Sequence, residues 1–439
     1  MLRETWTGKM GFILACVGSA IGLGNIWLFS WRMGAYGGAA FLIPYLLFVF
    51  GIASVGLMEE WAFGRSQRKG AVGAFENVFN SRWPGSGKFG AIIGIIPVLA
   101  VFSIFIFYAI VIGWLLKYLF LAVGGAFSTM DISEYFGAFA GTTATIGWHA
   151  AGVLGTMLIV LFGIQKGIEK ANKIMMPVLF AILIVLLIRS ITLPGAGEGI
   201  AYMFVPEWSK LASIETWIMA LGQAFFTLSL GGATMLVYGS YAREDTVIIS
   251  SSMQTVLFNF LASILAAFAI IPAVFAFGLD PAAGPGLLFV TLPNVFAKMP
   301  GGHIFGVLFF LSVVFAGFSS SVSMLEPAVE GLMDKTGMRR SIAVVILSAV
   351  AFAVGLPLAV DMGRFGTWAD IATIYVLPLG AVVAAVVFFW VYGADKARAE
   401  INKHAAHPVG KWFEAYAKYV FVAVALLVMI LNIVFGGIG

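Results

Sequence analysis

The chain has 439 residues, of which 61% are hydrophobic and only 10% are charged. Soluble domains carry about 25% charged residues, so this composition excludes a string of soluble domains and indicates an integral membrane protein. The net charge of +4 does not indicate a nucleic-acid partner, because the basic residues are scattered through short loops. A single cysteine excludes a disulfide framework, and four histidines without metal-ligand spacing argue against a zinc or iron centre.

About eleven stretches are apolar over the length that a helix needs to cross a bilayer core, which is about 20 residues. The stretches are 9–31, 39–63, 89–121, 147–164, 174–192, 214–238, 250–278, 303–332, 341–357, 368–393 and 417–436, and we number them as spans 1 to 11. Each is continuously apolar and lacks the alternation of barrel strands. The sequence therefore predicts an all-α membrane protein with one transmembrane domain over 1–439. Span 1 has no cleavage pattern, so we expect it to stay in the mature protein.

The distribution of positive charge predicts the orientation. With the N-terminus in the cytoplasm, 19 of the 25 lysines and arginines fall on inner segments, and the exceptions are Arg32, Lys117, Arg189, Lys210, Lys298 and Arg364. Positive residues concentrate in cytoplasmic loops of membrane proteins. We therefore expect a multi-pass protein of the cell membrane with a cytoplasmic N-terminus and, since the number of spans is odd, an extracellular C-terminus.

Two spans carry glycine clusters that interrupt a helix. Span 1 contains Gly18, Gly22 and Gly24, and span 6 contains Ser-Leu-Gly-Gly at 229–232. Small residues can also serve close helix packing. Here the clusters stand at positions 1 and 6 of the first ten spans, and paired interruptions of this kind are typical of transporters built from inverted repeats. The sequence predicts a first five-helix repeat at 9–192, a second, inverted repeat at 214–393, and an additional eleventh helix at 417–436.

Unwound backbone inside a membrane must line a cavity, because lipid cannot satisfy its polar groups. Carbonyl groups there suit a cation, and half-helix N-termini suit a carboxylate. Neutral side-chain oxygens, which are ligands for hard cations, stand near both breaks. They belong to Asn25, Thr227, Ser229, Asn259 and the serines at 319–321. Three consecutive serines cannot share one helix face, so we expect at most two of them at a site.

Six blocks occur in a fixed order along nearly the whole chain. They are Arg3 and Trp6 before span 1, Gly-Leu-Gly-Asn at 22–25, Glu-Trp-Ala-Phe-Gly-Arg at 60–65, Gln-Ala-Phe-Phe-Thr-Leu-Ser-Leu-Gly at 223–231, Asn259, and Ala-Gly-Phe-Ser-Ser-Ser at 316–321. Together they resemble the neurotransmitter:sodium symporter family, in particular its bacterial amino-acid transporters with the leucine-transporter fold. The resemblance implies an all-α fold with broken helices 1 and 6.

The resemblance also implies the binding residues. A first sodium ion would be held by the Ala20 carbonyl, Asn25, Thr227, Asn259 and the substrate carboxylate. A second would be held by carbonyls of Gly18, Ile21 and Ala316 and by the hydroxyls of Ser319 and Ser320. The Leu23 and Gly24 amides with the Tyr108 hydroxyl would grip the substrate carboxylate, under Phe226 as an aromatic lid. The implied substrate pocket comprises Ala20, Leu23, Gly24, Ile104, Tyr108, Phe226, Thr227, Ser229, Gly232, Ser320 and Met324.

Two departures from the family bear on the substrate. Gly22 stands where members that carry biogenic amines have an aspartate, which favours a substrate that brings its own carboxylate, an α-amino acid. Gly232 replaces a bulky pocket residue, so we expect an enlarged pocket. With Ile104, Phe226 and Met324 as apolar walls, this predicts large hydrophobic or aromatic amino acids.

The resemblance implies gates on both sides of the membrane. An inner gate would comprise Arg3, Trp6, Tyr241 and Asp334. At the outer gate the family's arginine is replaced by Leu28, and Arg32, one turn further on, is a candidate replacement with Asp370 as its partner. Glu326, late in span 8, is interpreted as a solvated residue near the membrane edge. In span 5, Gly167 and Pro177 resemble an unwinding motif that releases the second sodium ion, and the alternative is that Gly167 belongs to the loop.

Chloride dependence is left open by the sequence. Ser263 stands where many chloride-independent relatives have an acidic residue. A set of neutral donors, Tyr45, Gln223, Thr227, Asn259 and Ser263, matches the set that surrounds chloride in animal members of the family. The alternative is that Ser263 bonds its own helix and that Glu59 or another acid of span 2 supplies the negative charge.

The predicted function is sodium-coupled symport that imports amino acids by alternating access. The alternative within the same fold is a sodium-coupled carrier for another small zwitterion or compatible solute. The sequence has no nucleophile-base pair or cofactor motif of an enzyme, and no charged ring or continuous polar stripe of a channel. The expected ions are two Na⁺, with Cl⁻ open, and the expected partners are the substrate and the bilayer. The oligomeric state is left open.

Overall fold

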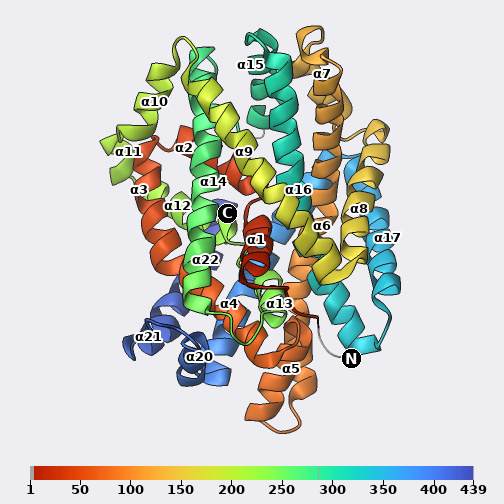
Figure 1. Cartoon of the computed structure of the whole chain (residues 1–439), viewed down its shortest axis with the longest axis vertical. Helices are drawn as coiled ribbons and strands as arrows, with labels where there is room; N and C mark the ends of the chain where they lie inside the picture. Colours follow the sequence, from red (N-terminus) through yellow and green to blue (C-terminus); the bar gives the residue numbers. More distant parts are fainter. Residues whose placement is uncertain (1–3, 285, 439) are drawn as a thin grey trace.

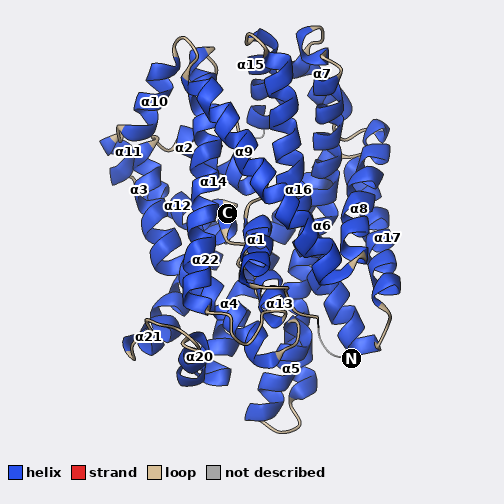
Figure 2. Cartoon of the chain, viewed as in Figure 1, coloured by secondary structure: helices blue, strands red, loops and turns tan. Residues whose placement is uncertain are grey.

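Helices make up the regular structure of residues 4–284 and 286–438, which the computed structural model describes (Figure 2). Within this part of the chain there is no strand. The longest helices run roughly alongside one another, and the central α1 contacts α9, α14 and α16 (Figure 1). Large apolar side chains such as Leu99, Phe162 and Ile188 remain exposed on the outside of this bundle, as expected of a surface that faces lipid.

The helices of the first half follow the predicted spans. Their bounds are α1 (Lys9–Ala20), η1 (Gly24–Leu28), α2 (Phe29–Ala35), α3 (Ala39–Phe48), η2 (Val49–Ala53), α4 (Ser54–Gln67), α5 (Ala71–Arg82), α6 (Gly87–Val123), η3 (Ala126–Ser128), α7 (Ile132–Phe139), η4 (Thr143–Thr145), α8 (Ile146–Leu161), η5 (Ile164–Glu169), α9 (Lys170–Ile191), α10 (Ala196–Phe204) and α11 (Trp208–Ala212). Among the η segments, η3 and η4 are 3₁₀ turns, and η1, η2 and η5 are π-helical.

The second half again begins with a broken span. Its bounds are α12 (Ile214–Thr227), α13 (Thr234–Ser240), α14 (Ile248–Ala276), η6 (Leu287–Thr291), α15 (Leu292–Lys298), α16 (Gly302–Thr336), α17 (Arg340–Ala359), α18 (Met362–Asp370), η7 (Ile371–Val376), α19 (Leu377–Val386), η8 (Val387–Gly393), α20 (Ala394–Ile401), α21 (Trp412–Ala415), η9 (Tyr416–Phe421) and α22 (Val422–Phe435). All of its η segments are π-helical.

The span count agrees with the sequence. In the described residues nine helices are long and apolar enough to cross a membrane, and the bent pair in span 1 makes a tenth. The remaining predicted span, number 6, consists of α12 and α13, which are too short to pass that test separately. The fold is therefore the predicted all-α membrane fold. The division into repeats at 9–192 and 214–393 stays a prediction.

Some helix ends differ from the predictions. Span 5 begins at Ile164 rather than 174, because the charged residues of its first turns lower the hydropathy without stopping the helix. Gly167 lies inside η5, so the alternative that it belongs to the loop is wrong, and Pro177 lies within α9. Helix α5, a short amphipathic segment between spans 2 and 3, was not predicted.

Both predicted breaks are present. In span 1, α1 ends at Ala20 and the chain bends by 60° before it resumes at Gly24. In span 6, the stretch 228–233 separates α12 from α13, and it contains Ser229 with φ 55° and Gly232 with φ 77°. A left-handed serine is strained, and such strain is typically maintained by the surroundings.

Glu60 holds the second break in place. Its carboxylate, on α4, is buried and accepts hydrogen bonds from the backbone N–H groups of Gly231 and Gly232, each at 2.9 Å, and of Leu236 at 3.3 Å. Unwound backbone leaves such donors without helical partners, and leaving them unsatisfied in a buried place is costly. One side chain therefore satisfies three backbone N–H groups at and just after the break.

We expect Glu60→Ala to destabilise the fold by about 3 kcal/mol or more, because up to three buried amides lose their acceptor at about 1 to 3 kcal/mol each. Thermal unfolding of the purified protein in detergent measures the loss. Glu244→Ala is the matched control, since that carboxylate is 90% exposed and only touches Arg68 at 3.6 Å. Equal unfolding temperatures for the two variants would contradict the role given to Glu60.

Candidate functional site

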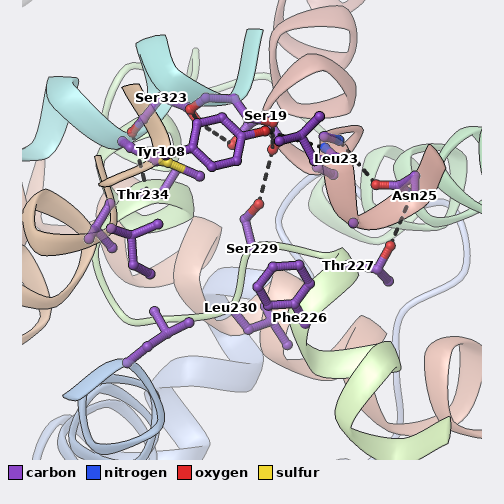
Figure 3. A pocket seen from close by; sticks show the side chains of 18 residues that line it. Ser19, Leu23, Asn25, Tyr108, Phe226, Thr227, Ser229, Leu230, Thr234 and Ser323 are labelled. Carbon is purple, nitrogen blue, oxygen red and sulfur yellow. Dashed lines mark hydrogen bonds between the residues drawn. The ribbon is translucent and has the colours of Figure 1, made fainter. Parts of the chain in front are cut away.

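A cavity of about 60 Å³ lies where the two breaks meet (Figure 3). Spans 1 and 6 contribute most of its walls, and α6, α16 and α19 complete them. The lining residues are Ser19, Ala20, Gly22, Leu23, Gly24, Asn25, Val101, Ile104, Tyr108, Phe226, Thr227, Ser229, Leu230, Thr234, Ser320, Ser323, Met324 and Leu377. None of these carries a formal charge. The cavity is thus a neutral pocket with polar groups at separate places in an apolar wall.

One end of the cavity presents hydrogen-bond donors beside an aromatic ring. The Leu23 N–H donates to the Tyr108 hydroxyl at 3.3 Å. The ring of Phe226 packs on Gly24 so closely that a Cβ there would lie 2.5 Å from Cε1 of the ring. A side chain at position 24 would therefore displace the ring. The sequence prediction that Leu23, Gly24, Tyr108 and Phe226 gather at one place is consistent with this arrangement.

Three polar lining residues, Ser19, Thr234 and Ser323, were not predicted. The Ser19 hydroxyl donates to that of Ser323 at 2.8 Å, and Ser229 donates to the Ser19 carbonyl at 3.0 Å (Figure 3). Thr234 donates to the Ser323 carbonyl at 3.4 Å. Ser323 could have been predicted from its helical spacing, because it stands one turn after Ser319 and Ser320. These bonds connect span 1, the span 6 break and α16 across the cavity.

A first cluster of oxygens surrounds the side-chain amide of Asn25. Its NH₂ group donates to Thr227 Oγ1 at 2.9 Å, Asn259 Oδ1 at 2.7 Å and Ser263 Oγ at 2.9 Å, and its Oδ1 accepts from the Gly22 N–H at 3.1 Å. All of these side chains are buried. Three oxygens from two different helices therefore converge on one donor next to the span 1 break.

A second cluster joins α16 to the end of α1. Ser319 donates to the carbonyls of Ala316 at 3.0 Å and Ile21 at 3.4 Å, and Ser320 donates to those of Ser19 at 3.2 Å and Ile21 at 3.4 Å. Ser321 points elsewhere, because its hydroxyl lies 2.7 Å from that of Thr156 on α8. The prediction that at most two of the three serines face one site is confirmed.

The position of Gly232 differs from the prediction that it lines the substrate pocket. It does not line the cavity, and a Cβ there would lie 2.6 Å from the Gly380 carbonyl and 2.8 Å from the Ala384 side chain, both on α19. The enlarged pocket inferred from this glycine is therefore wrong. The neighbouring Gly231 is the one directed at the wall, since a Cβ there would lie 2.5 Å from Leu377 and 3.8 Å from Val101. The positive φ values in the break shift the register, which the sequence alone does not reveal.

The contacts of Arg32 differ from the predicted pairing with Asp370. Its guanidinium is 3% exposed and donates through Nη1 to Gln223 Oε1 at 3.0 Å and to the Met219 carbonyl at 3.4 Å. Asp370 is exposed, and within the described residues the two form no ion pair. Arg32 contacts α12, the first half of span 6, instead, because Gln223 offers a buried acceptor within its reach.

The set predicted for chloride comes together next to Arg32. The Tyr45 hydroxyl lies beside Thr227, Asn259 and Ser263. Gln223 accepts from Arg32 and donates to the Gly24 carbonyl at 3.2 Å. Ser263 donates to the Asn259 carbonyl of its own helix at 3.1 Å, as the alternative interpretation expected. Glu59 is buried in α4. In this structure the hydroxyl proton of Ser263 and the side-chain amide of Gln223 are therefore both used within the protein.

The predicted inner gate is described in part. Arg3 lies outside the described residues. Trp6 is buried and donates through its indole N–H to the Tyr238 carbonyl at 3.0 Å, and its ring meets Tyr241 edge to face. The Tyr241 hydroxyl donates to Glu326 Oε1 at 2.8 Å.

Two acidic residues on α16 complete this region. Glu326 is fully buried and pairs with Arg340, whose Nη1 lies 2.9 Å from Oε1, so the interpretation of Glu326 as a solvated residue is wrong. Asp334 lies about two turns of α16 away, beside Lys335 at 3.8 Å and next to Gly73 of α5. Trp6, Tyr241, Glu326 and Arg340 thus form one cluster of contacts at this end of the bundle.

These features define a class of protein. Two broken spans that meet at a neutral cavity, with oxygen clusters on either side, are typical of ion-coupled secondary transporters. The comparisons define the family. The chain matches the sodium:neurotransmitter symporter family over residues 3–137 and 139–436, and it belongs to this family. It is a sodium-dependent symporter, not an enzyme.

Individual relatives agree with this assignment. An uncharacterized sodium-dependent transporter of Methanocaldococcus jannaschii is 34% identical over 98% of this chain and 91% of its own length. The sodium-dependent transporter YhdH of Bacillus subtilis is 34% identical, with 98% and 97% covered. The crystal structure of MhsT in complex with L-phenylalanine superposes with a TM-score of 0.87 at 36% identity, covering 98% of this chain and all of that one. The predicted fold is therefore confirmed.

We expect Tyr241→Phe to loosen the inner cluster, because it removes the hydrogen bond to a buried carboxylate. Such a bond is worth about 1.5 to 3 kcal/mol, which allows a population shift of about tenfold. Cys16, the chain's single cysteine, is buried in α1 and reports the change through its rate of alkylation in membranes. Tyr419→Phe, at an exposed tyrosine, is the control, and Cys16→Ala sets the background. Equal alkylation rates in Tyr241→Phe and the wild type would count against the gate.

Proposed function

We propose that this sodium-dependent symporter imports large apolar or aromatic α-amino acids by alternating access, with two Na⁺ ions. The observation that carries the proposal is the uncharged cavity at the two breaks, with donors at one end and apolar side chains at the other. We place the N-terminus in the cytoplasm and the C-terminus outside on the distribution of positive charge.

The substrate carboxylate is assigned to the backbone amides of Leu23 and Gly24 and to the Tyr108 hydroxyl. These groups donate hydrogen bonds and stand where the helix of span 1 resumes, which favours an anion. The surroundings of Gly22 disfavour an acidic side chain at this position as the source of negative charge. A Cβ there would lie 2.6 Å from Ser320 Oγ and 3.2 Å from the Tyr108 hydroxyl. With no room for an acidic side chain at this position, the negative charge comes with the substrate.

The first Na⁺ is assigned to Ala20, Asn25, Thr227 and Asn259. The oxygens of Thr227 and Asn259 already converge on the electropositive NH₂ group of Asn25. A cation suits the same oxygens, and a half-turn of the Asn25 amide would bring its own Oδ1 into the set. The substrate carboxylate would add charge next to it, which couples substrate binding to sodium binding.

The second Na⁺ is assigned to the carbonyls of Gly18, Ile21 and Ala316 and to the hydroxyls of Ser319 and Ser320. The two serines donate to carbonyls of this set. A hydroxyl can rotate its proton away and offer its lone pairs, so the same groups suit a hard cation. Since the ligands come from α1 and α16, an ion here would hold the end of α1 against α16. Release of this ion through a local opening of span 5 between Gly167 and Pro177 remains part of the proposal.

The preference for large apolar side chains rests on the cavity wall. The cavity wall is mostly apolar and consists of Val101, Ile104, Leu230, Met324 and Leu377 together with the Phe226 ring and Ser229. The structure of MhsT, which the chain resembles at 36% identity, holds L-phenylalanine. Burying an apolar side chain against such a wall is worth about 1.5 to 3 kcal/mol. The proposal does not depend on Gly232.

A different small zwitterion is the second candidate. Creatine transporters of mammals are 27% identical to this chain over 99% of its length. Creatine carries a carboxylate that could use the same donors. The apolar wall disfavours the guanidinium group of creatine, because its N–H donors would lack partners there.

Uptake into proteoliposomes under an imposed sodium gradient tests the function. We expect labelled L-phenylalanine to accumulate with Na⁺ and not with K⁺, and we expect tryptophan, tyrosine and leucine to compete better than glycine or alanine. Each methylene of fit is worth about 1 kcal/mol, so the difference should reach tenfold or more. Stronger competition by glycine, creatine or glycine betaine would contradict the assigned substrate class, and uptake without sodium would contradict sodium coupling.

We expect Asn259→Ala to lower the apparent sodium affinity of uptake by about tenfold or more, because the variant removes one side-chain oxygen from a desolvated cation at about 1 to 3 kcal/mol. The measurement is the sodium dependence of the initial uptake rate. Ser252→Ala is the control on the same helix, since this buried hydroxyl only bonds the Ile249 carbonyl at 2.9 Å. Wild-type sodium dependence in Asn259→Ala would remove this residue from the first site.

We further expect sodium-driven uptake to require chloride. We assign the anion position to the side chains of Tyr45, Gln223, Thr227, Asn259 and Ser263, and the buried Arg32 bonded to Gln223 supports this assignment with positive charge. Replacing chloride with gluconate should reduce the rate, and Ser263→Glu should restore it by supplying a fixed negative charge. Full wild-type activity in gluconate would overturn the chloride site and leave Ser263 with its bonds to Asn25 and to its own helix.

A further inference from the structure

Span 5 places a buried asparagine against the end of α1. Asn172, on α9, is 1% exposed, and its Oδ1 has no hydrogen-bond partner within the described residues. Its amide orientation is fixed, since Nδ2 donates to the Ile168 carbonyl at 2.9 Å. Reversing the amide would set Oδ1 against that carbonyl, so the oxygen has to point away from its own helix. A buried acceptor left in this way indicates a ligand or a role beyond packing.

The free oxygen points at Gly18. A Cβ on Gly18 would lie 1.9 Å from Asn172 Oδ1, and it would lie 3.3 Å from Cβ of Ser319. The absence of a side chain at Gly18 therefore makes room for the amide oxygen. Helices α1, α9 and α16 contact one another pairwise, so three elements converge at this point (Figure 1).

A second polar group continues the same face of span 5. Glu169, at the end of η5, is buried and packs on Gly11 of α1, where a Cβ would lie 1.9 Å from its Oε1. It accepts from the Thr7 N–H at 3.0 Å and pairs with Lys173 at 2.7 Å. Two glycines of α1, seven residues apart, thus receive two oxygen-bearing side chains of span 5.

We propose that Asn172 Oδ1 is a further ligand for the second sodium ion, on the span 5 side of Gly18. The inference rests on the proposed second site at Gly18, Ile21, Ala316, Ser319 and Ser320, and adds a side chain from a third helix. A neutral amide oxygen is a suitable donor for a hard cation. Because Asn172 also bonds Ile168 in the π-helical η5, occupancy of the ion is linked to the conformation of the segment around Gly167.

Binding of ²²Na⁺ to the purified protein in detergent, measured without transport, tests this ligand. We expect Asn172→Ala to raise the sodium concentration for half-saturation about tenfold, the effect of losing one oxygen ligand. We expect Asn172→Asp to lower it severalfold, because a carboxylate adds charge at the same reach. Asn294→Ala is the matched control, since that side chain makes the same bond to the carbonyl four residues earlier, at 2.9 Å, on α15.

The outcomes separate this inference from the proposed function. If the wild type binds sodium and both Asn172 variants match it, the assignment of Asn172 is overturned and the symport proposal stands. If the wild type shows no saturable sodium binding, the proposed function itself fails. Should Asn172→Ala not fold, Asn172→Asp decides alone, and wild-type sodium affinity in that variant overturns the ligand role. Sodium-dependent stabilisation against heat gives a second reading of the same affinity.

Discussion

Broken helices inside an apolar bundle are the constraint on which the rest of this structure depends. A membrane offers no water to unwound backbone, so each exposed N–H and C=O group has to find a partner in the protein. In span 6 the partner is Glu60, a buried carboxylate that accepts from amides on both sides of Gly232. In span 1 the partners are serine hydroxyls of α16, which donate to the carbonyls of Ser19 and Ile21.

The two breaks also explain why the cavity is neutral. Backbone dipoles supply donors and acceptors without formal charge, so the pocket can hold charged cargo without a buried ion pair of its own. Some of the charged groups inside the bundle form ion pairs away from the cavity, as Glu326 does with Arg340 and Arg65 does with Glu400 at 2.6 Å. Selectivity for ions and substrate can then arise from geometry and from the charges that the cargo brings.

Much of this architecture could be predicted from the sequence. Glycine clusters and neutral oxygens stand out in apolar helices, so the spans, both breaks and the serines at 319–321 could be located. The orientation of individual groups could not. Whether a glycine at 231 or 232 faces the pocket depends on left-handed φ values that follow from the tertiary structure. The partner of Arg32 is a glutamine from a distant helix, and Asn172 stands in a polar turn that is typical of a helix start near the membrane surface.

The chain of bonds from Arg32 through Gln223 to the Gly24 carbonyl has a mechanical consequence. It fastens the second half of span 1, after its break, to α12, the first half of span 6, by side chains that are buried. Bonds of this kind resist sliding of one segment past the other. The two segments should therefore move together as one rigid body. We therefore expect any rotation of these two joined segments to occur at the unwound residues 21–23 and 228–233, which serve as the two hinges.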